Sequence, residues 1–125
     1  MSFNGTAQYD VRFFGWFFDE EKRSDKVWGW IEIEGKLYNF WGRRDNTGDG
    51  KALKFKRHDA NWDARHDLQA LTSKKKAKGY KEANLARDEN GSYPAIDSIY
   101  PNFGAHMKRQ LMYARLTGTV RNENV

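Results

Sequence analysis

Residues 27–43 read VWGWIEIEGKLYNFWGR and decide the fold. Residues 27–33 and 37–41 are two runs of β-branched and aromatic residues, a composition typical of strands. Between the two runs stands Glu34-Gly35-Lys36, where the glycine favours a tight reversal of the chain. We therefore expect an antiparallel hairpin whose second strand ends in Trp41-Gly42-Arg43.

Two more strands are expected, one on either side of this hairpin. Residues 8–18, QYDVRFFGWFF, carry large residues at successive positions, which indicates a strand in a sheet that is covered on both faces. The charged segment 19–25, DEEKRSD, predicts the turn into the hairpin. Residues 51–57, KALKFKR, alternate lysines with Leu53 and Phe55, so this strand is expected to be buried on one side and cationic on the other.

The second half of the chain predicts two helices. Asp59 is the expected N-cap of the first helix, and Gly79 is expected to end it. The apolar stripe of this helix comprises Ala60, Trp62, Ala64, Leu68 and Leu71. The second helix is expected over residues 102–117. Its apolar face comprises Phe103, Met107, Leu111 and Ala114. Between the helices, residues 84–91 predict a loop and residues 93–97 a short extended piece imposed by its proline.

The bulk composition indicates one small domain outside the membrane. A chain of 125 residues is long enough for one modest core, and the 15% aromatic content means that large rings must fill it. The mean hydropathy is -0.97, and no stretch reaches the roughly 20 apolar residues that a membrane span needs. The N-terminus has no signal-peptide pattern, and the chain has no cysteine. We expect a cytoplasmic location, associated with the nucleoid if the source is prokaryotic or viral.

The positive charge is concentrated in the middle of the chain. The formal net charge is +5, but residues 41–81 contain 12 Lys and Arg against 5 Asp and Glu, while the flanking segments carry no excess of cations. A localised basic segment inside a folded domain is typical of a surface that binds a polyanion. The alternative interpretation is a lysine-rich face that serves only solubility.

A calcium loop is a partial match that the sequence disfavours. Four residues occupy positions 1, 3, 5 and 6 of an EF-hand-like loop: Asp45, Thr47, Asp49 and Gly50. Position 12, which needs a bidentate carboxylate, is Lys56. A cation at that position, inside a segment that is already basic, opposes calcium binding.

Neither a metal centre nor an enzyme is expected. His58 and His66 stand near two aspartates, Asp59 and Asp63, but imidazoles eight residues apart along a helix cannot share one ion. The chain contains no cysteine nucleophile, P-loop or H-E-x-x-H pattern. The acidic run at residues 19–21 lies in the expected turn, where carboxylates are solvated. We therefore expect a non-catalytic protein without a cofactor.

The Trp-Gly-Arg tripeptide at residues 41–43 is followed by two further motifs, KGYKE at residues 78–82 and GSYPAID at residues 91–97. In order and spacing these motifs resemble the WGR domain of the DNA-dependent poly(ADP-ribose) polymerases and of small stand-alone proteins. The resemblance covers about residues 9–97. It implies an α+β fold, a twisted antiparallel β-sheet with one helix packed across it, to which this chain adds a C-terminal helix. The domain division is then 1–97 for the WGR-like part and 98–125 for a helical extension packed on it.

The same resemblance implies a module that binds DNA at strand ends or nicks. The family's tryptophan packs on a terminal ribose and its arginine reaches the backbone, which here are Trp41 and Arg43. Independently of the family, an indole ring offers a flat surface to a sugar or base, and a guanidinium beside it pairs with phosphate. The expected DNA-binding residues are Trp41, Arg43, Arg44, Lys51, Lys54, Lys56, Arg57, Lys76, Lys78 and Tyr93. The competing interpretation makes Trp41 a core residue and Arg43 a surface charge.

Lysines are expected to carry most of the affinity. Lys51, Lys54, Lys56 and Arg57 would form a stripe that follows the phosphates. The lysines at residues 74–78 lie near the end of the first helix, where cations are favoured for purely local reasons as well.

A second functional hypothesis is a protein-interaction module. WGR-like domains also dock other protein domains, and such a module would act on a host protein if the chain is encoded by a phage. The second helix would supply the partner surface through Phe103, Met107 and Met112. This hypothesis and the DNA-binding one both describe a stand-alone accessory protein of a phage or bacterium.

Overall fold

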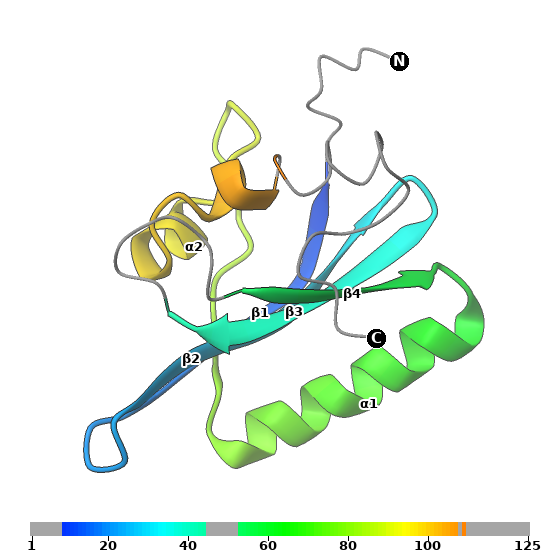
Figure 1. Cartoon of the computed structure of the whole chain (residues 1–125). Helices are drawn as coiled ribbons and strands as arrows, with labels where there is room; N and C mark the ends of the chain where they lie inside the picture. The colour runs from blue at the N-terminus through cyan, green and yellow to red at the C-terminus, as the bar shows by residue number, and fades with distance from the viewer. Residues whose placement is uncertain (1–8, 45–52, 108, 110–125) are drawn as a thin grey trace.

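The computed structural model describes residues 9–44, 53–107 and 109 (Figure 1). Its strands are β1 (Asp10–Asp19), β2 (Ser24–Ile33), β3 (Lys36–Arg43), β4 (Lys54–Asp59) and β5 (Lys81–Glu82). Its helices are α1 (Trp62–Lys78) and α2 (Pro94–Ile99). The strands form one antiparallel sheet in the order β4-β3-β2-β1-β5. The expected α+β class with an antiparallel sheet is therefore confirmed. The four matching residues of the disfavoured calcium loop, Asp45, Thr47, Asp49 and Gly50, lie outside the described residues.

The hairpin of β2 and β3 is confirmed, and its turn fixes the register of the sheet. Glu34 and Gly35 both have positive φ, 49° and 77°, as the two central residues of a type I′ turn require. Ile33 consequently faces Lys36, and every later pair follows from that one. A slip by one residue would turn the apolar residues of one face toward the other, so this turn also decides which side chains share a face.

Gly29 lies at the centre of the sheet, between Phe14 of β1 and Phe40 of β3. A Cβ atom on Gly29 would stand 2.2 Å from the carbonyl oxygen of Phe13 and 2.5 Å from the Phe40 ring. The Phe14 and Phe40 rings lie 5.6 Å apart, and the Phe103 ring is 5.2 Å from the first and 5.1 Å from the second. The absence of a side chain at Gly29 therefore makes room for three aromatic rings.

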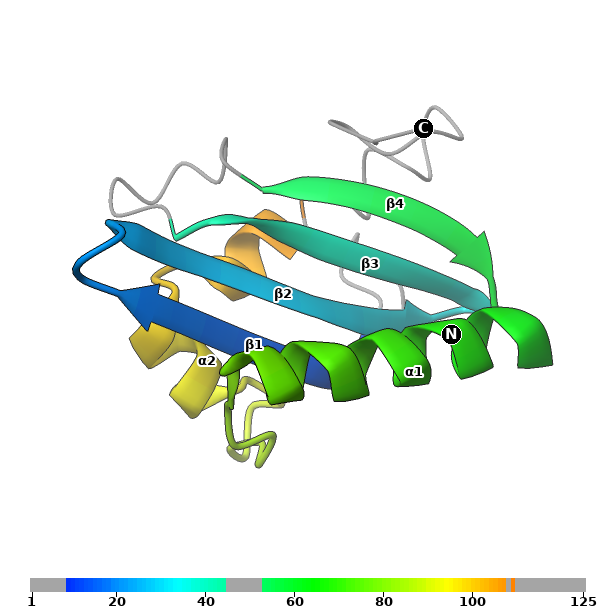
Figure 2. The same cartoon turned by 90° about the horizontal axis from the view of Figure 1, so that it is seen from below.

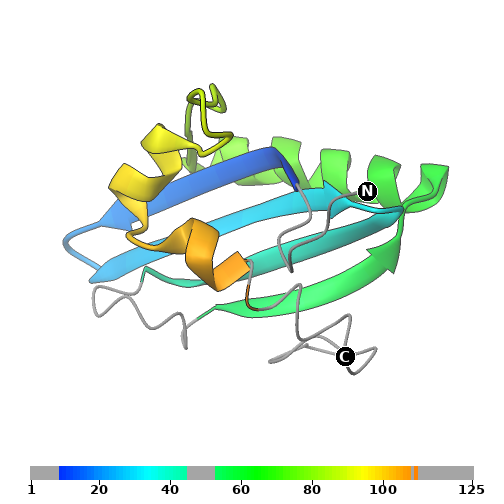
Figure 3. The same cartoon turned by 90° about the horizontal axis from the view of Figure 1, so that it is seen from above.

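Both faces of the sheet are covered, as the aromatic residues of β1 predict. Helix α1 packs on one face (Figure 2), and α2 together with the helical residues 103–107 packs on the other (Figure 3). Under α1 the buried residues are Phe13, Trp28, Trp30, Leu37, Leu68 and Tyr80. The opposite cluster is larger and includes Phe14, Phe40, Phe55, Tyr93, Ile96, Tyr100, Phe103 and Met107. Because Tyr100, Phe103 and Met107 belong to this cluster, residues 100–107 share the core of the sheet.

The boundaries of α1 differ from the expectation at one end only. Gly79 ends the helix with φ 111°, and its N–H bonds to carbonyls of the last turn. The N-cap is Asn61, whose side chain accepts a hydrogen bond from the Ala64 N–H at 2.9 Å, and not Asp59. Asp59 is the last residue of β4 and pairs with Lys36. The strand therefore runs two residues closer to the helix than the sequence pattern indicates.

The apolar stripe of α1 is only partly buried. Leu68 is buried, and Ala60 and Ala64 pack against its cluster. Trp62 and Leu71 are 72% and 39% exposed, so the expectation that they face the sheet is wrong. The Trp62 ring instead stacks on His66, with 4.9 Å between the ring centroids.

The expected extended piece at residues 93–97 is wrong beyond its first residue. Tyr93 is extended, with φ -111° and ψ 90°, as a residue before proline should be. Pro94 begins α2, because proline lacks only an N–H that the first turn of a helix does not use. Of the expected second helix, residues 103–107 are helical, and the part beyond residue 109 lies outside the described residues.

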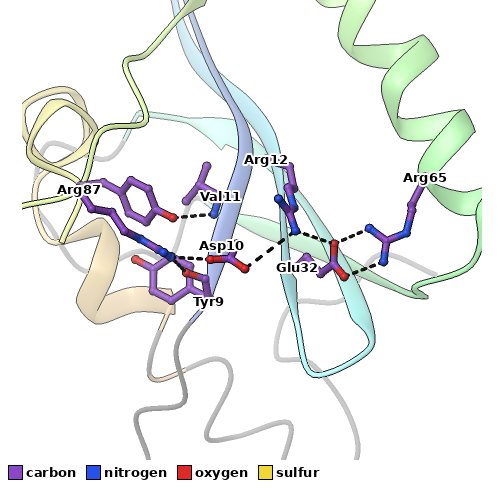
Figure 4. A network of polar contacts seen from close by, with 8 residues as sticks. Tyr9, Asp10, Val11, Arg12, Glu32, Arg65 and Arg87 are labelled. Carbon is purple, nitrogen blue, oxygen red and sulfur yellow. Dashed lines mark hydrogen bonds and ion pairs between the residues drawn. The ribbon is translucent and has the colours of Figure 1, made fainter. Parts of the chain in front are cut away.

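One network of polar contacts, continuous through the Arg12–Asp10 ion pair at 3.9 Å, ties the sheet to its neighbours (Figure 4). Glu32 of β2 accepts hydrogen bonds from Arg65 of α1 and from Arg12 of β1, the latter at 3.2 Å. Hydrogen bonding from Arg65 lowers the pKa of Glu32 below its ordinary value of 4.5. On the other side of β1, Arg87 donates to the Tyr9 carbonyl and to Asp10. These contacts hold α1 and the segment after β5 against the central strands.

Replacing Gly29 by alanine should lower the free energy of unfolding by about 3 kcal/mol, because a methyl group would collide with the Phe13 carbonyl, which cannot move without breaking the β1–β2 pairing. Urea denaturation of both proteins measures the difference. Gly104→Ala is the matched control. Its new methyl group would lie 3.5 Å from the Tyr9 hydroxyl, an ordinary contact, and we expect a change within about 0.5 kcal/mol. Equal effects of the two substitutions would contradict the packing at Gly29.

The Glu32 ion pairs should make stability depend on pH in a defined direction. A carboxyl group whose pKa is lowered by folding stabilises the native state fully above its ordinary pKa of 4.5, and this contribution is lost as the pH falls through the lowered value. Glu32→Gln should therefore reduce the urea midpoint at pH 7, and the difference from the wild type should shrink below about pH 4. The exposed Glu89, changed to Gln, should have no effect at either pH. A difference for Glu32→Gln that does not begin to shrink as the pH is lowered below 4.5 would contradict the ion-pair origin.

Candidate nucleic-acid interface

The register of the sheet brings Trp41 and Arg43 onto one face with lysines from two other strands. Trp41 faces Trp28 on β2 and Lys54 on β4, and Arg43 faces Lys26. Directly opposed residues of antiparallel strands project to the same side of a sheet. This side is the α1 face, because Trp28 belongs to the cluster beneath α1. Lys56, two residues after Lys54, lies on the same face.

Helix α1 covers only part of this face. Its Thr72 hydroxyl accepts a hydrogen bond from the Trp30 indole N–H at 3.0 Å, and the Lys75 ammonium lies 5.7 Å from the Trp28 ring. Both contacts are made with β2. Figure 2 shows the C-terminal end of α1 beside β1, while β4 forms the opposite edge of the sheet. Arg43, Lys54 and Lys56 are consequently exposed, and Trp41 is half-buried.

A pocket of about 480 Å³ lies between β2, β3 and the C-terminal end of α1. We call it the Trp41 pocket. Its lining residues are Lys26, Val27, Trp28, Asn39, Trp41, Gly42, Arg43, Lys75 and Tyr80. The volume falls within the range of small-ligand sites, about 300–1,000 Å³. Three aromatic rings and three cations line it, and no carboxylate does. Such a lining suits a flat group that carries negative charge.

Among the described residues, the indole N–H groups of the pocket's two tryptophans, Trp28 and Trp41, have no acceptor. The indole N–H of Trp16 donates to Asp25 at 2.8 Å, and that of Trp30 donates to Thr72. Among residues 9–44, 53–107 and 109, by contrast, no group accepts a hydrogen bond from the indole N–H of Trp28 or Trp41. Both rings line the Trp41 pocket, so a ligand there could meet two N–H donors.

The cations of this face find no carboxylate partner among the residues that the structure describes. We call them the basic face: Lys26, Arg43, Lys54, Lys56, Lys75 and Lys78. Within the described part of the chain none of the six pairs with a carboxylate. Lys26 and Arg43 even stand directly opposite each other, an arrangement that costs free energy in an antiparallel pair. Burial lowers the pKa of Lys75, and the nearby charges of Lys78 and Lys26 lower it further. The folded protein therefore maintains a repulsion that an anion would relieve.

Gly42 is required by the backbone at the mouth of the pocket. Its φ of 146° lies in a region that is essentially restricted to glycine. Gly42 also lines the pocket between Trp41 and Arg43. A side chain at Gly42 would strain the backbone of β3 between Trp41 and Arg43, the two functional candidates.

Four of the predicted DNA-binding residues lie away from this face or have other partners. Arg44 pairs with Asp25 at 2.8 Å and lies over the Trp16 ring, which packs against the opposite cluster. Arg57 projects to the same side as Tyr38, so the expectation that it joins the lysine stripe is wrong: strand alternation separates it from Lys54 and Lys56.

Tyr93 is buried, and its hydroxyl accepts a hydrogen bond from the Val11 N–H at 3.0 Å. Its ring is therefore a core element and is not available to a base. Lys76 pairs with Glu82 at 3.3 Å. Lys51 lies outside the described residues. Trp41, Arg43, Lys54, Lys56 and Lys78 remain as the predicted residues that the fold brings to one side.

The sequence prediction missed Lys26, and a signal for it was present. With a two-residue turn at Glu34-Gly35, pairing along the hairpin places Lys26 opposite Arg43 and Trp28 opposite Trp41. The part played by Lys75 and Tyr80 could not be read in this way. Both depend on how α1 lies on the sheet, which no local pattern fixes.

Comparison of the chain with models of known protein families, with curated proteins and with solved structures gave no match. Within residues 9–44, 53–107 and 109, no helix is long and apolar enough to cross a membrane. In the same residues, no group of three or more His, Asp or Glu side chains is placed to hold a metal ion.

The crowding of ammonium groups around Lys75 can be measured directly. In protein with ¹³C-labelled lysine, the ε-carbon shift of Lys75 followed by NMR should report a pKa below its ordinary value of 10.5. Lys26→Gln should raise that pKa, since it removes a neighbouring positive charge. Lys36→Gln, at the far end of β3, should leave it unchanged. If Lys26→Gln left the pKa of Lys75 unchanged, the result would contradict the close approach of the two ammonium groups.

Proposed function

We propose that the chain is a non-catalytic nucleic-acid-binding module that holds a sugar-phosphate backbone on the basic face. The observation that carries this proposal is the common location of the half-buried Trp41 ring, the Arg43 guanidinium, and Lys54 and Lys56 on one side of the sheet. The Trp-Gly-Arg resemblance supports DNA as the nucleic acid, with ends or nicks as the preferred structure.

The chemistry of each group fits this role. Lysines on β4 neutralise phosphates and release condensed counterions, which supplies affinity without sequence information. The Arg43 guanidinium can make two parallel hydrogen bonds to one phosphate. The exposed part of the Trp41 ring offers a flat apolar surface to a sugar or an unstacked base. Among the described residues, Arg43, Lys54 and Lys56 form no ion pair with a carboxylate.

Two of the three residues expected to supply the protein-partner surface are buried. Phe103 and Met107 are each 1% exposed and belong to the core, and Met112 lies outside the described residues. A partner that binds through these side chains would have to unfold the C-terminal segment.

Titration of labelled duplex DNA over a series of salt concentrations tests the proposal. If six cations contact phosphates, log K should fall against log salt with a slope of roughly -5. Lys54→Gln with Lys56→Gln should reduce the magnitude of that slope by roughly 2, and Arg43→Ala should weaken binding at least tenfold. Arg57→Gln is the matched control: it removes a charge from the same strand but from the other face, so it should change binding little. Equal losses in Arg57→Gln and the lysine variants, or no binding at low salt, would refute the basic face.

Competition among substrates refines the proposal. Blunt, nicked and closed circular DNA separate recognition of ends from general backbone binding, and an RNA duplex of the same sequence tests the preference for DNA. Nucleic acid recovered intact after incubation with a divalent cation would agree with a non-catalytic module. Cleavage by the purified wild-type protein that is absent from equally purified basic-face variants would instead assign an enzyme.

A further inference from the structure

We propose that the Trp41 pocket is a site for a free nucleotide, a small phosphate ester that carries a flat aromatic ring. This goes beyond backbone binding on the basic face, because it assigns a ligand of a different kind to a defined cavity. One consequence, which does rest on the proposed function, is that a free nucleotide and a nucleic acid would compete for Trp41 and Arg43.

The aromatic part of such a ligand has suitable walls. Trp28, Trp41 and Tyr80 line the pocket, and their rings offer the flat apolar surfaces on which bases stack. The indole N–H groups of Trp28 and Trp41 find no acceptor among the described residues. An oxygen or ring nitrogen of a ligand could accept from them. A purely apolar ligand would bury these donors without partners, at a cost, which favours a base or sugar over a hydrocarbon.

The phosphate part has three cations to meet. Lys26 and Arg43 are directly opposed across β2 and β3, and Lys75 enters from α1, where its ammonium lies 5.3 Å from the Tyr80 ring. The cations therefore come from three elements around one cavity. Burial lowers the pKa of Lys75 and the nearby charge of Lys26 lowers it further, so a phosphate between these two ammonium groups would relieve their repulsion. Since the lining has no carboxylate, the pocket selects against cationic ligands.

The lysines that line the pocket are different from the lysines of β4 that are expected to hold a nucleic acid. Lys26 and Lys75 line the pocket, whereas Lys54 and Lys56 do not, although all four belong to the basic face. The pocket is open to solvent, and its volume of about 480 Å³ falls within the range of small-ligand sites. Different lysines can therefore be removed to test the two kinds of binding independently.

Isothermal titration calorimetry with adenosine triphosphate, adenosine and inorganic pyrophosphate tests the assignment. We expect binding of the triphosphate, and at least tenfold weaker binding of both adenosine and pyrophosphate, because each of these retains only half of the contacts. Lys26→Gln with Lys75→Gln should weaken triphosphate binding at least tenfold. Lys54→Gln with Lys56→Gln should leave it within twofold. Urea denaturation of both double variants shows that each is folded.

Three outcomes would overturn the site: no heat of binding with millimolar triphosphate, equal affinities for triphosphate and pyrophosphate, or equal losses in the two double variants. A short single-stranded oligonucleotide in place of the triphosphate separates the two sources of the same chemistry. Binding of the oligonucleotide that depends on Lys26 and Lys75, without binding of the free nucleotide, would make the pocket part of a strand-binding track and would also overturn the proposal. Nucleotide binding without duplex binding would uphold the pocket while refuting the nucleic-acid module.

Discussion

The close approach of three strands at Gly29 is the constraint on which the rest of this structure depends. Only a hydrogen atom fits on its α-carbon beside the Phe13 carbonyl and the Phe40 ring. Because no side chain stands there, the Phe14 and Phe40 rings approach each other and Phe103 closes over both. The helical residues 103–107 are thereby held on the face opposite α1. The opposite face is left to α1, which is too narrow to cover it, and the uncovered part contains the candidate site.

Charged side chains around the sheet are paired in some places and unpaired in others. Beneath α1, Glu32 pairs with Arg12 and Arg65. On the side of α2, Arg44 and Arg87 are each paired with an aspartate and each lies over an aromatic ring. These two guanidinium groups therefore cover aromatic rings at the edge of the core. On the side of α1, the six residues of the basic face have no carboxylate partner among the described residues. Stability alone would favour pairing or dispersing these charges, and their concentration supports the proposal of an anionic ligand.

The hairpin, the alternation of β4 and the end of α1 were predictable because each follows from local chemistry. A glycine allows a tight turn, alternation gives a half-buried strand, and a glycine with positive φ ends a helix. Tyr93 and Arg57 could not be assigned from local chemistry. Whether a tyrosine is a binding or a core residue depends on Val11, 82 residues away, which donates to its hydroxyl. Arg57 was misassigned for a simpler reason: the alternation that placed Lys54 and Lys56 on one face also excludes the next odd-numbered position from it.

The position of the lysines on β4 has a further consequence for association between copies of the chain. Among the described strands, β4 is one of the two outer ones, and a strand at the margin of a sheet presents backbone groups to which a strand of another molecule can pair. Lys54 and Lys56 place two like charges along this margin, so a second β4 brought alongside would be repelled before hydrogen bonds form. A long polyanion that neutralised these lysines would remove that protection, and crowded complexes could then associate edge to edge.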